Sequence, residues 1–360
     1  MSDRSFYQQL RCRLKTEPVV LATIVKITGS APREVGAKMA VCADGSIIGT
    51  IGGGAGEGKV IQRALTVLKT DKKQLVEIDL TGTPGKDIQG VCGGKVQVWL
   101  EKWSGKRAIA LVEQILELFK IGQSAKLITP FKNTQPYLIN GNSLLEYGRC
   151  AKRPYTSDRF APLHLCTSAQ FIETIQPEPI LLIIGGGHVA VALAQIASFA
   201  GFQIAVQDDR PEFVTQERFP QATFLFSSIN KTLDTLAAHS QIYIALVARG
   251  YSQDLEALQE ILQRPLTYKY IGAIGSKKRI RLIRQELERQ ESIEISNFYA
   301  PIGLDIGALT PEEIAISICG ELIKVRRGGT GLSLCDRIKN VTRPSKVHLG
   351  ELLHAENLPQ

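Results

Sequence analysis

The chain has 360 residues, 44% of them hydrophobic and 22% charged, a balance typical of a globular protein large enough for two domains. Seven scattered cysteines without a Cys-x-x-Cys spacing, and five histidines without a His-x-x-x-His pair, argue against a disulfide framework and a zinc ribbon. The net charge of +8 comes from dispersed basic residues, which disfavours a nucleic-acid partner and favours anionic ligands. The sequence has no long apolar run and no signal-peptide core, which predicts a cytoplasmic protein without a membrane span.

The N-terminal part of the sequence predicts an α+β domain. A strongly apolar strand is followed by a turn-rich loop and by a hairpin whose turn is Asp44-Gly45. Helical spacing then alternates with further strands. The expected elements are strands at 19–27, 74–80 and 95–101, a loop at 29–36, a hairpin at 37–52, and helices at 58–70 and 108–119.

Pro177 and Pro179 flank Glu178 and mark a boundary, because proline discourages helix immediately before it. Beyond this point strand and helix alternate, which predicts a doubly wound parallel sheet. We therefore expect an N-terminal domain at 1–178, a Rossmann-like domain at 179–328 and a tail at 329–360. The expected strands are 180–184, 203–207, 242–247 and 269–273, and the expected helices are 188–200, 252–263, 276–289 and 311–326.

The stretch LLIIGGGHVAVALAQIA (181–197) leaves a strand and enters a helix with glycines at 185 and 187 and alanine at 190. This pattern predicts a dinucleotide-binding turn, with a ribose-binding carboxylate at Asp208 or Asp209 at the end of the next strand. The alternative is a tight turn retained for packing, with Asp209 and Arg210 forming a surface ion pair. His188 could contact a ligand or simply cap the turn.

Two more glycine clusters, at 49–59 and 90–95, lie in the N-terminal domain, and neither is a P-loop. Such turns either expose amide groups to a bulky ligand or serve only as hairpin and bulge turns. Cys92 lies between glycines and near Lys95, where its thiolate could bind a soft metal or accept sulfur.

Several long blocks, in order, resemble the XdhC/CoxI family of xanthine dehydrogenase accessory proteins. They include GSAPREVGAKMAVCADGSIIGTIGGGAGEGKVIQRA, GVCGGKVQVWLE, IIGGGHVAVALAQIASFAGFQIAVQDDRPEF, YIGAIGSKKR and PIGLDIGALTPEEIAISICGELIKVRRG. The resemblance implies a factor that binds the molybdenum cofactor (molybdopterin), assists exchange of an oxo ligand for sulfur, and delivers the cofactor to an apo molybdenum hydroxylase of the xanthine dehydrogenase type.

Carried onto this chain, the resemblance implies that Cys92 handles sulfur or molybdenum and that the glycine motifs contact the cofactor. It also implies that the cofactor cleft lies where the two domains face each other. The cofactor-binding candidates are Ser30, Arg33, Gly52, Gly53, Gly54, Glu57, Gly93, Gly94, Gly185, Gly187, His188, Asp208, Asp209, Arg210, Arg249, Gly275, Ser276 and Asp305.

The chain departs from the family pattern at two places. Relatives commonly have histidine where this chain has Tyr251, and a hydrophobic residue where it has Gly56. The first departure implies that any chemistry of that histidine is lost or passes to the Tyr251 phenol.

The leading interpretation is therefore a cofactor carrier rather than an enzyme with turnover of its own. An NAD(P)-dependent oxidoreductase that uses Gly185 and Gly187, and a regulatory protein that binds a nucleotide, are the alternatives. The apo hydroxylase is the expected partner, a cysteine desulfurase is a candidate second partner, and a homodimer is a candidate assembly.

Overall fold

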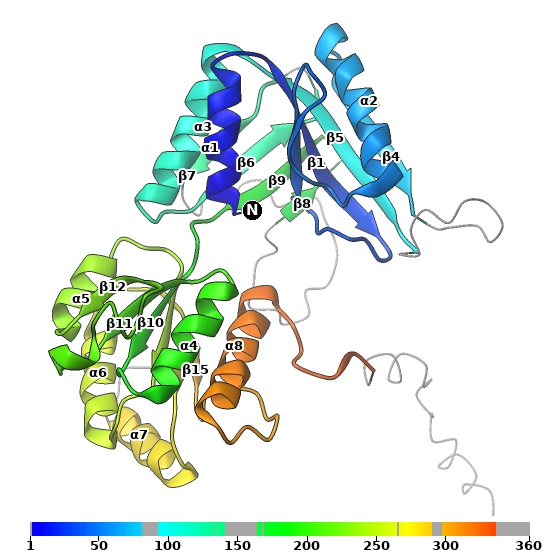
Figure 1. Cartoon of the computed structure of the whole chain (residues 1–360). Helices are drawn as coiled ribbons and strands as arrows, with labels where there is room; N and C mark the ends of the chain where they lie inside the picture. The colour runs from blue at the N-terminus through cyan, green and yellow to red at the C-terminus, as the bar shows by residue number, and fades with distance from the viewer. Residues whose placement is uncertain are drawn as a thin grey trace, which may run out of the picture.

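A computed structural model describes residues 2–80, 93–132, 134–140, 164–167, 169–264, 266–289 and 297–335. It confirms the expected fold class: a mixed α+β domain precedes a Rossmann-like domain with a parallel sheet (Figure 1). The predicted boundary at residue 178 and the predicted tail stay predictions. Within the described part of the chain, no helix is long and apolar enough to cross a bilayer.

The N-terminal domain is built around a five-stranded antiparallel sheet in the order β3-β2-β1-β5-β4. The apolar run at 19–27 forms its central strand, and the Asp44-Gly45 turn joins β2 and β3 as predicted, with the Ser46 amide donating to the Asp44 carboxylate over 2.8 Å. The strands are β1 (Val19–Thr28), β2 (Lys38–Val41), β3 (Ile47–Gly49), β4 (Gln74–Asp79) and β5 (Lys95–Trp103).

Three helices cover this sheet. Helix α2 (Gly54–Thr70) packs on one face, and α1 (Asp3–Leu14) and α3 (Gly105–Lys120) pack on the other (Figure 1). Helices α2 and α3 were predicted, but α1 was not. Phe6, Leu10 and Leu14 have helical spacing, but charged residues between them obscure the apolar pattern. The structure shows that these three side chains are buried against the sheet.

A second sheet, which the sequence analysis did not predict, completes the N-terminal domain. It is antiparallel in the order β7-β6-β9-β8, and Leu127 and Ile175 join it to the core beneath α1 and α3. Its strands are only three to six residues long, so local periodicity gives little signal for them. They are β6 (Ala125–Pro130), β7 (Tyr137–Asn140), β8 (His164–Cys166) and β9 (Gln170–Ile175).

The Rossmann-like domain has six parallel strands in the order β12-β11-β10-β13-β14-β15. The order reverses beside β10, and this switch point is where open α/β sheets bind ligands. All four predicted strands are confirmed, whereas edge strands β12 and β15 were not predicted. The strands are β10 (Ile180–Ile184), β11 (Gln203–Gln207), β12 (Ala222–Phe226), β13 (Ile242–Leu246), β14 (Tyr268–Ala273) and β15 (Phe298–Tyr299).

Helices lie on both faces of this sheet, as predicted. One core is shared by α4 (His188–Phe199) and α8 (Pro311–Arg327), which lie side by side (Figure 1). The other is shared by α5 (Ile229–Leu236), which was not predicted, α6 (Tyr251–Gln263) and α7 (Lys277–Arg289). A 3-10 turn, η2 (Pro211–Phe213), follows β11.

Helix α8 begins and ends as its sequence predicts. Thr310 accepts a hydrogen bond from the Glu313 amide over 3.2 Å, and the Glu313 carboxylate accepts from the Thr310 amide over 3.0 Å. This reciprocal pair satisfies amide groups that the first turn leaves without partners. Gly328 ends the helix in the left-handed conformation, with φ of 69°.

The two domains meet at the amino ends of the parallel strands. The turn after α3 touches the turn before β13: the Ser240 amide donates to the Gly122 carbonyl over 2.7 Å, and the hydroxyls of Ser124 and Ser240 are 2.8 Å apart. The Gln123 side chain also donates to the Ala238 carbonyl. The carboxyl ends of the strands therefore face away from the N-terminal domain.

Candidate functional site

The candidate residues of the Rossmann-like domain gather at one edge of the parallel sheet. Each lies just after a strand ends, and parallel strands all end at the same edge. Gly185, Gly187 and His188 follow β10, Asp208, Asp209 and Arg210 follow β11, Arg249 follows β13, Gly275 and Ser276 follow β14, and Asp305 follows β15.

The glycine turn after β10 has two tight positions and one open position. A Cβ atom on Gly185, whose φ is +113°, would lie 2.7 Å from the Val247 carbonyl oxygen, and one on Gly186 would lie 2.8 Å from Phe213. A Cβ on Gly187 would meet nothing within 4 Å. Gly187 is also the N-cap of α4 and makes no side-chain cap, so the amides of that first helical turn border open space.

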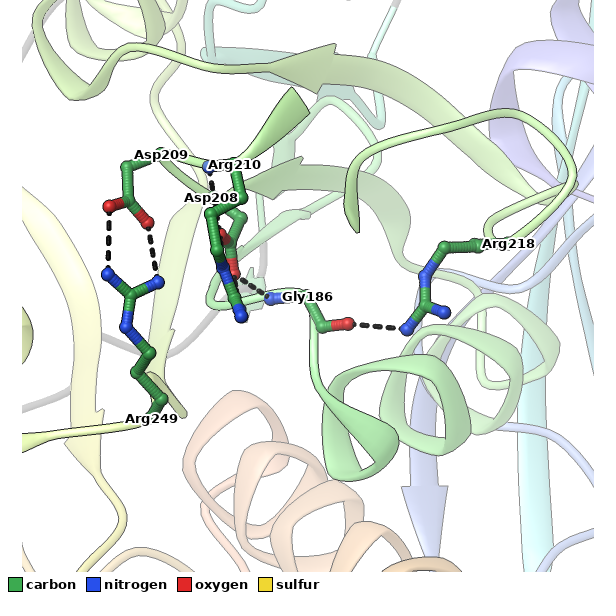
Figure 2. A network of polar contacts seen from close by, with 6 residues as sticks. All are labelled: Gly186, Asp208, Asp209, Arg210, Arg218 and Arg249. Atoms are coloured by element: carbon green, nitrogen blue, oxygen red, sulfur yellow. Dashed lines mark hydrogen bonds and ion pairs between the residues drawn. The ribbon is translucent and has the colours of Figure 1, made fainter. Parts of the chain in front are cut away.

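Asp208 stabilises this turn from within (Figure 2). One carboxylate oxygen accepts from the Gly186 amide over 2.7 Å and from the Arg210 guanidinium, and the other accepts from the Arg210 amide and side chain. Burial opposes the charged form, but these bonds outweigh it and hold the pKa of Asp208 well below its usual range. Both oxygens are thus engaged inside the protein.

Asp209 is exposed and makes a bidentate ion pair with Arg249, with both contacts at 3.1 Å (Figure 2). The alternative of a surface pair between Asp209 and Arg210 is therefore wrong in its partners. Arg210 turns inward to Asp208, and Asp209 pairs with Arg249. Because Asp209 follows β11 and Arg249 follows β13, their pair bridges the two neighbours of β10.

Two groups that the sequence analysis missed support this edge. Arg218 donates to the Gly186 carbonyl over 2.8 Å (Figure 2). Its guanidinium carbon also lies 5.0 Å from the centre of the Phe213 ring. Arg279 forms an ion pair with the fully buried Asp254 and donates to the Gly250 carbonyl over 2.7 Å. Burial raises the pKa of Asp254 to about 6, although the Arg279 guanidinium pulls it down. No local motif marks these contacts, since their partners are distant in sequence.

The N-terminal candidates form a second group, far from the first. Gly94 lies against the backbone of Ser30, where a Cβ would be 2.2 Å from the Ser30 carbonyl oxygen, and Ser30 bridges Gly93. The Pro32 ring lies against Gly52, where an added Cβ would be 2.6 Å from the Pro32 Cγ atom. The loops at 28–32, 52–54 and 93–94 thus meet on an exposed ledge, which we call the glycine ledge.

Glu57 accepts hydrogen bonds from the loop that leads into the ledge. Its carboxylate accepts from the Thr50 hydroxyl over 2.6 Å and from the amides of Ile51 and Gly53 over 3.1 Å each. Glu57 therefore fixes the loop before α2, while added Cβ atoms on Gly53, Gly54 and Gly93 would meet nothing within 4 Å. Cys92 lies outside the described residues. Among those described, no three His, Cys, Asp or Glu side chains are grouped to hold a metal ion.

Comparisons with known proteins agree with the motifs on both domains. A sequence model of the XdhC and CoxI family matches residues 12–79, and a model of the XdhC Rossmann domain matches residues 181–322. The chain belongs to the XdhC/CoxI family. Both matches contain glycine motifs described above, on the ledge and after β10.

Individual relatives of this XdhC/CoxI chain cover most of its length. A Bacillus subtilis protein, named as a probable xanthine dehydrogenase subunit, is 28% identical over 86% of the chain and 94% of its own length. The Escherichia coli molybdenum cofactor insertion chaperone PaoD is 26% identical over 85% of the chain and 83% of its own length. The chain is 28% identical to the uncharacterized Escherichia coli protein YqeB, of which it spans only 44%.

A solved structure is similar over almost the whole chain. The crystal structure of a protein described as a xanthine dehydrogenase from Bacillus halodurans superposes with a TM-score of 0.68 at 26% identity, covering 91% of this chain and 96% of that one. The fold of this chain is therefore similar to that of the Bacillus halodurans protein over most of both chains.

The structure shows what surrounds Gly56 and Tyr251, the two residues that depart from the family pattern. Gly56 lies against Ile78, where an added Cβ would be 2.8 Å from a methyl carbon, so Ile78 fills the space of the usual hydrophobic side chain. Tyr251 begins α6 at the carboxyl edge and packs against the core beneath that helix.

A cavity of about 1320 Å³ lies between the domains, and most of the candidate residues lie outside it. Its Rossmann-like wall includes Pro179, Gln203, Gln241 and Lys269, at the amino ends of four strands. Of the described candidates, only Arg33 lines it. The expectation that the glycine turn after β10 faces the N-terminal domain is wrong, because the chain enters β10 from that domain and the turn lies at the other end of the strand.

Proposed function

We propose that this protein binds the molybdenum cofactor as cargo and assists its insertion into an apo molybdenum hydroxylase. The observation that carries the proposal is the match to both XdhC/CoxI models, joined with relationship to PaoD, a molybdenum cofactor insertion chaperone, over 85% of the chain. A client of the xanthine dehydrogenase type, sulfuration of the cofactor with a cysteine desulfurase, a homodimer and a cytoplasmic site of action extend the same proposal.

The described residues suit a phosphate-bearing cargo at two places. The first turn of α4 offers amides beside the open position at Gly187, and amides of this kind bind phosphate oxygens. The glycine ledge leaves room for the cargo at Gly53, Gly54 and Gly93, although the Gly53 and Gly93 amides already donate to Glu57 and to the Leu80 carbonyl. In this proposal Cys92 supplies the thiolate that contacts molybdenum or sulfur.

The test is purification from molybdenum-replete cells, followed by pterin fluorescence, metal analysis and activation of an apo hydroxylase. We expect bound pterin and molybdenum, and activation that depends on added protein. A preparation that carries neither and activates nothing would refute the proposal. Cys92→Ser should fold normally yet lower retained molybdenum or activation about tenfold, ~1.4 kcal/mol. Cys319→Ser is the control, because Cys319 is buried in α8 and should act only on stability.

A nicotinamide dinucleotide enzyme is the second candidate, and the strand order with the open Gly187 favours it. Asp208 weakens it, because both of its oxygens are already engaged. Binding of NAD(P) that Gly187→Val abolishes, followed by turnover of a substrate, would support this candidate over the carrier.

A further inference from the structure

The interdomain cavity is large, and more basic than acidic side chains line it. At about 1320 Å³ it exceeds the ~300–1,000 Å³ that a typical small-molecule pocket occupies. Seven lysine or arginine side chains and four aspartate or glutamate side chains line it. This excess of positive charge favours an anionic ligand.

Three of these cations, Arg4, Lys269 and Arg327, make no ion pair or side-chain hydrogen bond in the described part of the chain. Lys38 pairs with the buried Glu173, and Arg326 donates to the Ala200 carbonyl and lies over the Phe202 ring. Arg327, at the end of α8, and Lys269, at the start of β14, have no carboxylate partner within the described ranges of the chain. A phosphate in the cavity would supply the missing counter-charge.

Phe199 adds an aromatic surface. It is the last residue of α4, it lines the cavity, and it is 97% exposed. Burying such a side chain is worth about 1.5–3 kcal/mol, so its full exposure beside a cavity suits a ligand with a flat ring that stacks on it.

The N-terminal wall contains two buried polar atoms that lack hydrogen-bond partners among the described residues. Glu173 is 3% exposed, and its Oε1 atom has no hydrogen-bond partner among the described residues, nor has Nδ1 of His164. Burial, with the nearby Lys38 charge, lowers the pKa of His164 to about 4, so its imidazole is neutral at physiological pH. A carboxylate and a neutral imidazole can both bind the polar edge of a heterocycle.

We propose that the interdomain cavity binds a phosphorylated heteroaromatic ligand, its ring against Phe199 and its phosphate at Lys269 and Arg327. The proposed function supplies such a ligand, the pterin phosphate of the molybdenum cofactor, and the assignment to a pterin rests on that function. This one phosphate then lies in the cavity rather than at the α4 turn or the glycine ledge. A nucleotide shares this chemistry, so the experiment separates the two sources.

The experiment is equilibrium dialysis of the full-length protein against neopterin monophosphate, neopterin and AMP. Wild type should bind neopterin monophosphate. Phe199→Ala and Arg327→Gln should each weaken that binding at least tenfold, about 1.4 kcal/mol, and only Phe199→Ala should also weaken binding of neopterin. Both side chains are exposed, so folding should be unchanged. Leu282→Ala and Lys231→Gln are the matched exposed controls and should bind as wild type does.

Two results would overturn the inference. One is that neopterin monophosphate does not bind to wild type, or binds to Phe199→Ala and Arg327→Gln with unchanged affinity. The other is binding of AMP, but not of the pterin, through the same side chains. If these variants still co-purify with pterin and molybdenum, the inference fails while the proposed carrier function stands. If wild type co-purifies with neither, the carrier function itself fails.

Discussion

The glycine turn after β10 allows a sharp test, because its two outer glycines differ in surroundings. Gly187 has φ of −75° and open space around a built Cβ. Gly187→Ala lowers the entropy of the unfolded chain, which stabilises the folded protein by about 0.4–1 kcal/mol. Alanine is also a poorer helix N-cap than glycine, which offsets this gain, so the net change in unfolding free energy should stay under ~0.5 kcal/mol. Gly185→Ala meets strain of about 1–2 kcal/mol from positive φ, and its Cβ contacts the backbone of Val247 and Ala248 below 3 Å. We expect a loss of ~3 kcal/mol.

Urea unfolding followed by two signals measures this difference. Both tryptophans, Trp99 and Trp103, lie in β5 of the N-terminal domain, so their fluorescence is an internal control, whereas circular dichroism reports both domains. Gly185→Ala should shift the dichroism transition to lower urea and leave the tryptophan transition in place. Gly187→Val should keep both transitions yet weaken binding of a phosphate ligand at this edge. Equal destabilisation by Gly185→Ala and Gly187→Ala would refute the reasoning.

Three further changes test other contacts. Asp254→Ala leaves the Arg279 guanidinium without its buried partner and should cost about 3 kcal/mol in urea unfolding; a loss below ~1 kcal/mol would contradict the role given to this pair. Glu57→Ala removes the acceptor for two amides and a hydroxyl and should cost about 2 kcal/mol, whereas the exposed Glu34→Ala should cost nearly nothing. Because burial lowers the pKa of His164 to about 4, folding stability should fall as the pH drops from about 6.5 to 4. His164→Gln should remove about 1 kcal/mol of the stability loss between pH 7 and 5. An unchanged pH dependence of stability in this variant would contradict the lowered pKa.

The fold was predictable where burial leaves a continuous local pattern. The run at 180–184 is buried at every position. The capping box of α8 needs only Thr310 and Glu313, which lie three residues apart in the sequence. The second N-terminal sheet and α1 were missed because their apolar residues gain a partner only through distant segments.

The candidate edge was predictable from strand ends, but the roles within it were not. Spacing could not decide between Asp208 and Asp209, because neighbouring residues at a strand end point in opposite directions. Asp208 turns to the Gly186 amide and Asp209 to Arg249, and only coordinates reveal the difference. The contacts of Arg218 and Arg279 join residues more than 20 positions apart and leave no sequence signature.

The junction between the turns at 122–124 and 238–240 has a kinetic consequence. Three hydrogen bonds join these turns among the described residues, and each contributes about 1 kcal/mol net. Parting them would expose the cavity without disturbing either hydrophobic core, on the microsecond to millisecond scale of domain motion. Under the carrier function proposed above, the dwell time of a bound cofactor would then depend on its own contacts with the cavity. An acceptor that competes for those contacts would set the rate of transfer.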